Sequence, residues 1–372
     1  MTTLFPLGQL APLLVLAAAI LGFVRPGRRP GYVPQLAEAA ALGALALAAL
    51  GAVQLVMGSA QTTGAGAFLL RLDAASATMT LLVAFVGWVV VRYSRSYLDG
   101  EAQEGRFHGL MLTALAAVLV LVQSGSLPVL IASFIAIGVV LRQLLLFYDD
   151  RAEARRAATK FTLVWGAGDL ALVLAAVFLW QAFGTVDVVA LGAAAQDGLP
   201  RAGHLAAAFL VLAAALKTAS FPLHGWLTEV MEAPTPVSAL LHAGIINAGG
   251  FLLIRNAELV QASPGALAAL VMLGGFTALF GAMVMLTQSA VKTALAWSTV
   301  SQMGFMLLQC GLGLWALALL HIVAHSLYKA HAFLASGNAV RAVVSINRPG
   351  AIAVPGLGAV ARAFLLALAI YA

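Results

Sequence analysis

The residues best suited to chemistry in this sequence are lysines that lie inside long apolar runs. The chain has four lysines among 372 residues; Lys217 and Lys329 lie within apolar runs, and Lys292 lies at the start of one. An ammonium group at the centre of a bilayer costs roughly 2.5 to 3.5 kcal/mol on insertion scales, so each needs a partner, water or a function. A buried lysine, unlike an arginine, can exchange a proton near neutral pH. We interpret all three as parts of a cation path; the alternative is that each extends its ammonium group to the membrane interface.

Two histidines precede Lys329 in the same apolar run at a regular spacing. His321, His325 and Lys329 lie at positions i, i+4 and i+8, so a helix places all three on one face. Three titratable groups along one membrane helix form a candidate proton path. The alternative is a polar stripe that holds neighbouring helices together by hydrogen bonds. No carboxylate or cysteine accompanies these histidines, so the pattern does not predict a metal site.

A single carboxylate, Asp169, interrupts the apolar run Phe161–Phe183. It needs a cation, and Lys217 on the following membrane helix is the natural candidate, because opposite charges keep each other ionised. We therefore expect an ion pair between Asp169 and Lys217. The alternative is that Asp169 caps or hydrogen-bonds a neighbouring helix.

A proline-containing segment, MEAPTPVSALLHA at residues 231–243, leads to another candidate, His242. Pro234 and Pro236 cannot continue a helix, and Ser238 is placed to help cap a restarted one. Helix breaks at membrane depth are tolerated only beside protein or water, and they often mark ion sites, so His242 joins the candidate path. The alternative is a simple interfacial loop between two spans.

The composition indicates what must position these groups. Hydrophobic residues make up 62% of the chain and charged residues only 9%, whereas a soluble domain has about 25% charged residues. We predict an all-α integral membrane protein, a single polytopic domain over residues 1–372 with about 11–12 transmembrane helices. The candidate spans are Leu7–Val24, Leu36–Met57, Ala74–Val91, Phe107–Val122, Leu127–Phe147, Phe161–Phe183, Leu205–Phe221, Val237–Arg255, Ala266–Leu286, Val291–Gln309 and Trp315–Ser336. A last apolar run, Ala363–Ala372, is too short to cross. We expect either that the chain ends within a twelfth helix or that it is an unusually short version of its kind.

Basic residues in the short loops predict the orientation. The loops after the first, third and fifth spans carry most of them, as with Arg25, Arg28 and Arg29 after the first span. The positive-inside rule then places these loops in the cytoplasm and the N-terminus outside. We expect the protein in the cell inner (plasma) membrane. The formal charge of +6 is thus an orientation signal and does not predict a nucleic-acid partner.

Four long sequence blocks resemble one family of membrane proteins. The blocks are RLDAASATMTLLVAFVGWVVVRYSRSYL from Arg71, KTASFPLHGWLTEVMEAPTPVSALLHAG from Lys217, VKTALAWSTVSQMGFMLLQCGLG from Val291 and HIVAHSLYKAHAFLASG from His321. They are similar to the proton-conducting, antiporter-like subunits of respiratory complex I and of the Mrp antiporters. The resemblance implies two inverted five-helix repeats with broken helices, a first half-channel at about residues 107–255 and an incomplete second one at about 266–372.

The same resemblance implies roles for individual residues. The residues that match the family's ion path are Asp169 before the central lysine, Lys217 as that lysine, His242 in the PTPVSALLHA block, Lys292 as the connection between half-channels, and His321, His325 and Lys329 in the second half.

One departure from the family pattern narrows the resemblance. The family's channel subunits usually carry a Trp-Glu pair in the fifth span, whose glutamate modulates the central lysine. The stretch SFIAIGVVLRQLLLFY has Phe134 and Ile135 there and no acid. Arg142 in this stretch is a candidate modulator, which either reaches the surface or lies against the bundle interior. The missing acid, the Arg142 region and the segment SQMGFMLLQCGLGL together make the chain resemble the DabB branch of the family. This branch comprises the membrane subunits of two-component inorganic carbon transporters.

That branch implies a function shared between two proteins. This chain would conduct H⁺ or Na⁺ and so drive one-way hydration of CO2 to bicarbonate in a DabA-like, zinc-containing cytoplasmic subunit that resembles β-carbonic anhydrases. The chain itself would be a transporter subunit and not an enzyme. One alternative is a proton-translocating subunit of NADH-quinone oxidoreductase or of an Mrp Na⁺/H⁺ antiporter, and another is a structural anchor. The sequence has no phosphate-loop, Rossmann or nucleophile-elbow pattern, so no cofactor is expected.

Overall fold

Long apolar helices dominate the structure, as the composition requires. The computed structural model describes residues 6–58, 61–230, 233–345 and 356–371. Within these ranges, nine helices are long and apolar enough to cross a membrane. The prediction of an all-α integral membrane fold is therefore confirmed. The chain divides into two compact units, Met1–Ser336 and Gly337–Ala372.

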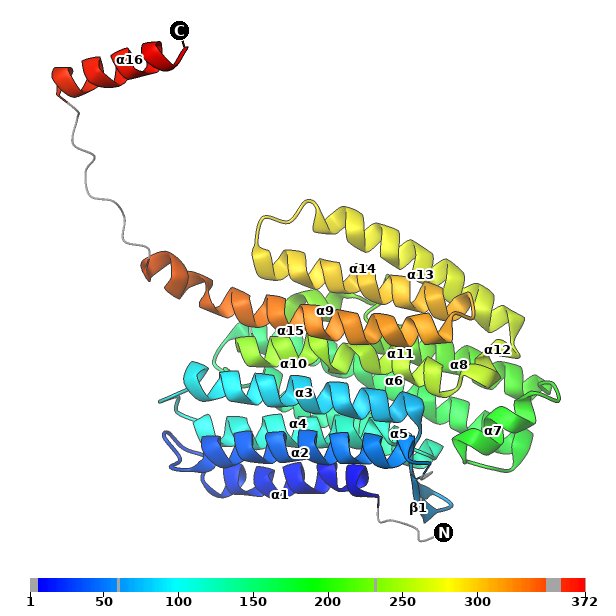
Figure 1. The fold of residues 1–372 in the computed structure, drawn as a ribbon. Coiled ribbons are helices and arrows are strands. Elements are labelled where there is room, and N and C mark those ends of the chain that lie inside the picture. The colour runs from blue at the N-terminus through cyan, green and yellow to red at the C-terminus, as the bar shows by residue number, and fades with distance from the viewer. Residues whose placement is uncertain (1–5, 59–60, 231–232, 346–355, 372) are drawn as a thin grey trace. The chain divides into compact units, whose positions relative to one another are not determined.

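Up to α15, the helices follow one another along the chain in the first unit, whereas α16 belongs to the second unit (Figure 1). They are a 3₁₀ turn η1 (Leu7–Leu10), α1 (Ala11–Val24), α2 (Val33–Val56), α3 (Ala74–Tyr97), α4 (Glu104–Val122), α5 (Leu127–Leu145), α6 (Ala152–Phe183), α7 (Val188–Ala195), α8 (Arg201–Lys217), α9 (Gly225–Glu229), α10 (Thr235–Ala243), the 3₁₀ turn η3 (Ile245–Asn247), α11 (Ala248–Arg255), α12 (Ala257–Gln261), α13 (Pro264–Met285), α14 (Val291–Gly311), α15 (Trp315–Ser345) and α16 (Leu357–Tyr371). Every predicted span coincides with a helix or, for Val237–Arg255, with the group α10, η3 and α11. The last run, Ala363–Ala372, falls in α16 except for Ala372, which lies outside the described residues.

Two predicted spans form helices that do not belong to the nine. Helix α8 has 17 residues and packs against α6 and α11. Helix α14 has 21 residues, packs along α13, and interrupts its apolar surface with serine, threonine and glutamine. Both helices carry candidate path residues or their partners.

Glycines allow neighbouring helices to approach closely. A Cβ on Gly22 of α1 would lie 2.6 Å from the backbone nitrogen of Gly109 on α4. Between α13 and α14, a Cβ on Gly274 would lie 2.4 Å from the nitrogen of Leu308. Lipid provides no hydrophobic force between helices, so membrane helices associate through such close van der Waals contact at small residues.

A short β-hairpin connects α2 to α3 and was not predicted. Strands β1 (Gln61–Ala65) and β2 (Phe68–Leu72) pair antiparallel, with Gln61 opposite Leu72. Gly64 and Gly66 adopt φ values of 92° and 57°, which glycine accepts without steric conflict. The strands are too short and too close to the apolar run of α3 to stand out in the sequence.

The span at residues 235–255 is broken in its middle. Helix α10 begins at Thr235 after Pro234, as predicted from the two prolines. The predicted cap is wrong, because the Ser238 hydroxyl has no hydrogen-bond partner among the described residues. A second break follows at Gly244 (φ −123°, ψ −72°), where α10 ends and the 3₁₀ turn η3 leads into α11. The sequence analysis placed the break only at the prolines.

Candidate functional site

Lys217 and Asp169 form the ion pair that the sequence predicted. Lys217 is the last residue of α8, and Asp169 lies in the middle of α6, which packs against α8. The lysine Nζ lies 2.6 Å from Asp169 Oδ1. The Lys217 side chain is 0% exposed and that of Asp169 is 17% exposed. The ammonium group therefore does not reach the membrane interface.

Two aromatic rings complete the surroundings of Lys217. Its Nζ lies 4.1 Å from the centre of the Trp165 ring and 4.6 Å from that of Phe134. The Trp165 indole N–H donates to the Phe134 carbonyl at 3.0 Å, which fixes one ring relative to the other. Rings at these distances attract a cation through their quadrupole. Phe134 stands at the position for which the resemblance implied a Trp-Glu pair. In this chain the residue at that position contacts the lysine through a cation–π interaction.

Trp165 is a site residue that the sequence analysis missed. It precedes Asp169 by four residues, a spacing that puts both on one face of α6. Its carbonyl also accepts a hydrogen bond from Lys217 Nζ at 3.4 Å. The helical spacing from Asp169 was the available signal, but nothing in the sequence says that this face meets Lys217.

The end of α8 is shaped to present the lysine. The chain leaves the helix through Thr218 and Ala219, whose φ of 51° lies in the left-handed region. The backbone N–H and the hydroxyl of Thr218 both donate to Ala214 O, at 2.9 Å and 2.8 Å, and so tie this residue to the last turn of the helix. Gly249 of α11 faces this turn, and a Cβ on it would lie 2.6 Å from Thr218 Cγ2. The close approach of α11 thus holds the turn after Lys217 in place.

A polar ladder joins α15 to α14. His321, His325 and Lys329 share one face of α15, as predicted. His321 Nδ1 lies 2.9 Å from Gln309 Oε1, and His325 Nδ1 lies 2.5 Å from Gln302 Oε1. Lys329 Nζ donates to Ser298 Oγ at 2.7 Å and to Leu295 O at 3.2 Å. The partners on α14 were missed, because their polarity was read only as part of a sequence block.

His242 belongs to the same group although it comes from the earlier half of the chain. Its Nδ1 lies 3.0 Å from Thr299 Oγ1, which itself donates to Leu295 O at 3.0 Å. The hydroxyl therefore accepts from His242 Nδ1–H. His325 Nε2 donates to the His242 carbonyl at 3.2 Å. Leu295 O thus receives hydrogen bonds from both Thr299 and Lys329. The contacts link His242 to Lys329 through the Thr299 side chain and the Leu295 backbone carbonyl of α14.

The Phe333 ring covers His242. The two rings stack with centres 4.2 Å apart and 17° between their planes. His242 is fully buried, and its Nε2 has no hydrogen-bond partner in the part of the chain that is described. A buried polar atom of this kind carries a desolvation penalty. The unpaired Nε2 of His242 therefore needs an explanation, and a role in the candidate path provides one.

Two predicted site residues lie apart from these groups. Lys292 is in the first turn of α14, partly exposed, and makes no hydrogen bond or ion pair with the residues described. Arg142 is exposed near the end of α5. Within the described ranges it contacts neither Lys217 nor Asp169, so of the two orientations considered the structure shows the outward one.

Comparison with protein families assigns the class of this chain. Residues 124–353 match the family described as NADH:quinone oxidoreductase/Mrp antiporter, TM, and residues 66–108 match the N-terminal region of chain 5 of complex I, NADH-ubiquinone oxidoreductase. The first match covers more than half of the chain and contains all the candidate path residues. The chain therefore belongs to the NADH:quinone oxidoreductase/Mrp antiporter family.

Individual proteins of known sequence or structure are also similar to this chain. The probable inorganic carbon transporter subunit DabB2 of Halothiobacillus neapolitanus is 42% identical over 91% of this chain and 64% of its own length. The probable subunit DabB of Hydrogenovibrio crunogenus is 43% identical over 75% of this chain and 54% of its own length. The chain thus spans between half and two thirds of these relatives. In the Mrp complex from Dietzia sp., one chain superimposes with a TM-score of 0.79 at 26% identity, covering 95% of this chain and 39% of that one.

Proposed function

We propose that this chain is the membrane subunit of an energy-coupled inorganic carbon transporter and that it conducts H⁺ or Na⁺. A DabA-like, zinc-containing cytoplasmic subunit would carry out the hydration of CO2, and this chain would not itself be an enzyme. The names of two relatives at 42% and 43% identity support the transported substrate. The observation that carries the ion-moving role is Lys217, a fully buried ammonium group held by one carboxylate and two rings.

The surroundings of Lys217 suit a group that gains and loses a charge. With the ammonium group charged, Asp169 and both rings attract it. With the proton gone, the rings lose their attraction and Asp169 is left without its cation, so each change of charge on Lys217 changes the local field. Phe134 and Trp165 have no group that titrates, so of these three neighbours only Asp169 can change its own charge in response to the charge on Lys217.

The ladder between α14 and α15 tolerates protonation changes in its histidines. A neutral imidazole has one donor and one acceptor nitrogen, whereas a protonated one has two donors. A glutamine carboxamide can turn either its oxygen or its NH₂ group to the ring. Gln302 and Gln309 can thus pair with His325 and His321 in both states. This property supports a role for the ladder in proton movement, beyond that of a polar stripe between helices.

The expected location is the inner membrane with the N-terminus outside. The loop after α1 contains Arg25, Arg28 and Arg29. The loop between α5 and α6 contains Arg151, and the beginning of α6 adds Arg155, Arg156 and Lys160. Both loops lie after odd-numbered spans, so the positive-inside rule supports a cytoplasmic location for them.

Changing Lys217 to Ala tests the central role. We expect uptake of inorganic carbon to be abolished in cells that coexpress the variant with the partner subunit, while the protein still inserts in the membrane. Lys160→Ala is the matched control, because Lys160 is half exposed and pairs with Glu229 outside the candidate path. Isotope-labelled bicarbonate accumulation and membrane immunoblots provide the two measurements. Normal uptake by the Lys217→Ala variant would contradict the proposal.

A further inference from the structure

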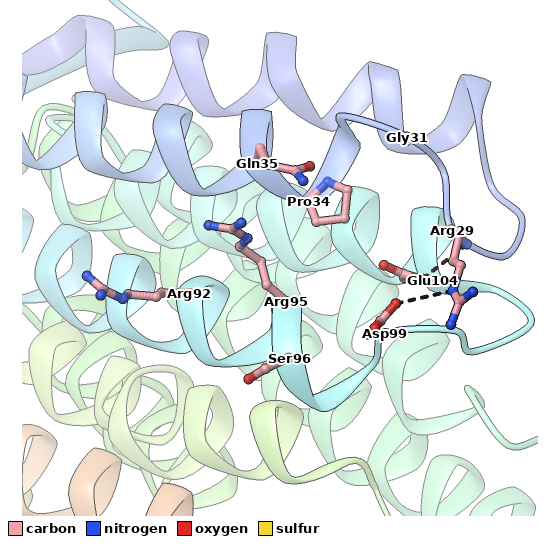
Figure 2. Close-up of a pocket in the computed structure, with 9 residues that line it drawn as sticks. All are labelled: Arg29, Gly31, Pro34, Gln35, Arg92, Arg95, Ser96, Asp99 and Glu104. Atoms are coloured by element: carbon pink, nitrogen blue, oxygen red, sulfur yellow. Dashed lines mark hydrogen bonds and ion pairs between the residues drawn. The ribbon is translucent and has the colours of Figure 1, made fainter.

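A polar cavity lies away from the candidate path, between the α1–α2 loop, the start of α2 and the end of α3. Its volume is about 530 Å³, and Arg29, Arg92 and Arg95 line it together with Asp99 and Glu104 (Figure 2). None of the residues of the candidate path lines this cavity. The ion-conducting role therefore does not explain why three guanidinium groups gather here.

The acids near the cavity leave most of the arginine donors free. Arg92 and Arg95 share Glu38, and Arg29 Nε lies 3.5 Å from Asp99 Oδ1. Each guanidinium group has five N–H donors, and these pairs engage only part of them. The loop before α2 adds two more basic residues, of which Arg25 places its Nη1 3.5 Å from the Cβ position of Gly31. Three arginines thus line the cavity together with two carboxylates, and Glu38 pairs with two of these arginines.

The carboxylate of Glu104 binds backbone N–H groups. Glu104 is buried, and its Oε2 accepts hydrogen bonds from the backbone N–H groups of Arg29 at 3.1 Å and Gly100 at 3.0 Å. It therefore holds the two loops together and shapes the wall of the cavity, as Figure 2 shows. Its charge does not occupy the guanidinium groups.

The start of α2 adds a further anion-attracting feature. The helix has 24 residues, its first turn has no acidic residue, and no side chain caps it. Pro34 and Gln35 of this first turn line the cavity. Because the N-terminus of a helix carries a partial positive charge and free N–H groups, it favours an anion at the same place as the arginines.

The surface beside the cavity is apolar. Leu36 and Leu42 on α2 and Phe85 on α3 are exposed along the helices that run from the cavity into the membrane. The Arg92 guanidinium group lies 5.7 Å from the centre of the Trp88 ring, between the charged and the apolar regions. A ligand with an anionic head and an apolar tail matches both surfaces, whereas a free oxyanion matches only the cavity.

We propose that this cavity binds the phosphate of an anionic phospholipid headgroup, whose acyl chains lie along the exposed faces of α2 and α3. Basic pockets at the ends of membrane helices suit such lipids, since each arginine near the surface contributes about 1 kcal/mol of attraction. Arg29 and Arg92 are the main ligands, because Arg95 is largely engaged by Glu38.

Lipid titration of the purified full chain tests this site. Native mass spectrometry in detergent measures retention of phosphatidylglycerol by the wild type and by the double variant Arg29→Gln/Arg92→Gln. We expect the variant to bind phosphatidylglycerol roughly ten- to thirtyfold more weakly, the loss expected for two arginines. The double variant Arg155→Gln/Arg156→Gln makes the same charge change near the start of α6, outside the cavity lining, and should bind as the wild type does.

A charge-conserving variant and a thermal-unfolding experiment complete the test. Arg29→Lys/Arg92→Lys keeps both charges and should retain most of the binding, which excludes misfolding as the cause of the loss. Thermal unfolding with phosphatidylglycerol, with phosphatidylcholine and with inorganic phosphate identifies the occupant, because a bound ligand raises the unfolding temperature. Stabilisation by inorganic phosphate alone would overturn the lipid assignment, and equal lipid loss in both Gln double variants would overturn the site.

Discussion

At the scale of single residues, the buried charge of Lys217 is held by one carboxylate and two aromatic rings. The ion pair with Asp169 supplies one opposite charge, and the Phe134 and Trp165 rings supply a second source of attraction that does not titrate. A cation–π contact contributes about 0.5 to 2 kcal/mol, with the larger values where water is excluded. The contribution is comparable to that of a hydrogen bond to a charged group, so removing one ring should be measurable.

Phe134→Leu tests the contribution of the ring. The change keeps an apolar side chain but removes the quadrupole, and we expect transport to fall about three- to tenfold, the equivalent of about 1 kcal/mol. Phe134→Tyr keeps a ring and should retain most of the activity. Phe209→Leu, in a stacked pair with Phe178 away from Lys217, controls for loss of packing. Equal activity in Phe134→Leu and the wild type would show that the ring has no part in holding the charge.

At the scale of elements, a single arginine joins segments from distant parts of the chain. Arg255 at the end of α11 pairs with Asp73 at the start of α3, 182 residues earlier. Its Nε also donates to the Ser124 carbonyl, just after α4, at 3.1 Å. Asp73 in turn caps α3 through the backbone N–H of Ser76. One polar cluster thus fixes the ends of three helices and the hairpin before α3.

The pKa of Asp73 makes this cluster sensitive to acid. Burial by itself would raise the pKa of the carboxyl group, but the Arg255 charge and the hydrogen bonds from Ser76 and Arg255 together hold it below its ordinary value of 3.8. A carboxyl group with a lower pKa in the folded than in the unfolded state stabilises the fold above the unfolded value. That stabilisation is lost as the pH falls through the folded pKa.

Asp73→Asn should therefore lower the thermal midpoint of the detergent-solubilised protein by several degrees at pH 7. The difference from the wild type should shrink between about pH 5 and pH 3, because protonation removes the same charge in the wild type. Asp197→Asn, an identical change at an exposed position, should have little effect at either pH. A difference that stayed constant over this range would mean that the charge of Asp73 does not stabilise the fold.

At the scale of the whole molecule, the candidate path consists of two groups of residues from different helices. The first is Lys217 with Asp169 and the two rings, in the predicted first half-channel. The second is the ladder of α14 and α15, in the predicted second half-channel, which His242 joins from the first half. Lys292, the predicted connection, contacts neither group among the described residues. Among the candidate path residues, His242 is therefore the one whose contacts join the predicted first half-channel to the predicted second one.

The nature of the groups in the path favours H⁺ over Na⁺ as the coupling ion. Lysine and histidine nitrogens exchange protons and repel a metal cation when charged. Dissipating the proton gradient with an uncoupler, at constant external Na⁺, should thus stop the accumulation of bicarbonate in cells expressing both subunits. The control is removal of external Na⁺ without uncoupler, which should leave accumulation intact. If uptake survived the uncoupler and ceased on removal of Na⁺, the coupling ion would be Na⁺.

The sequence alone determined the membrane class and the positions of the spans. A helix that crosses a bilayer must be apolar over about 20 residues. Because this requirement concerns one continuous segment, it can be recognised from the sequence. Local periodicity also predicted the shared face of His321, His325 and Lys329. The ion pair between Asp169 and Lys217 was predicted because a buried charge needs an opposite charge. The transport roles of these residues stay predictions.

Only the tertiary structure decided which helix faces meet. The rings of Phe134 and Trp165 lie at Lys217, and Gln302 and Gln309 lie at the histidines, because α5, α6, α8, α14 and α15 pack in a particular register. That register depends on close contacts at small residues such as Gly249, whose partners are far away in the chain. In lipid, all outward apolar faces are nearly equivalent, so the pattern of hydrophobic residues does not specify the neighbours of a helix; the fit of one surface against another does.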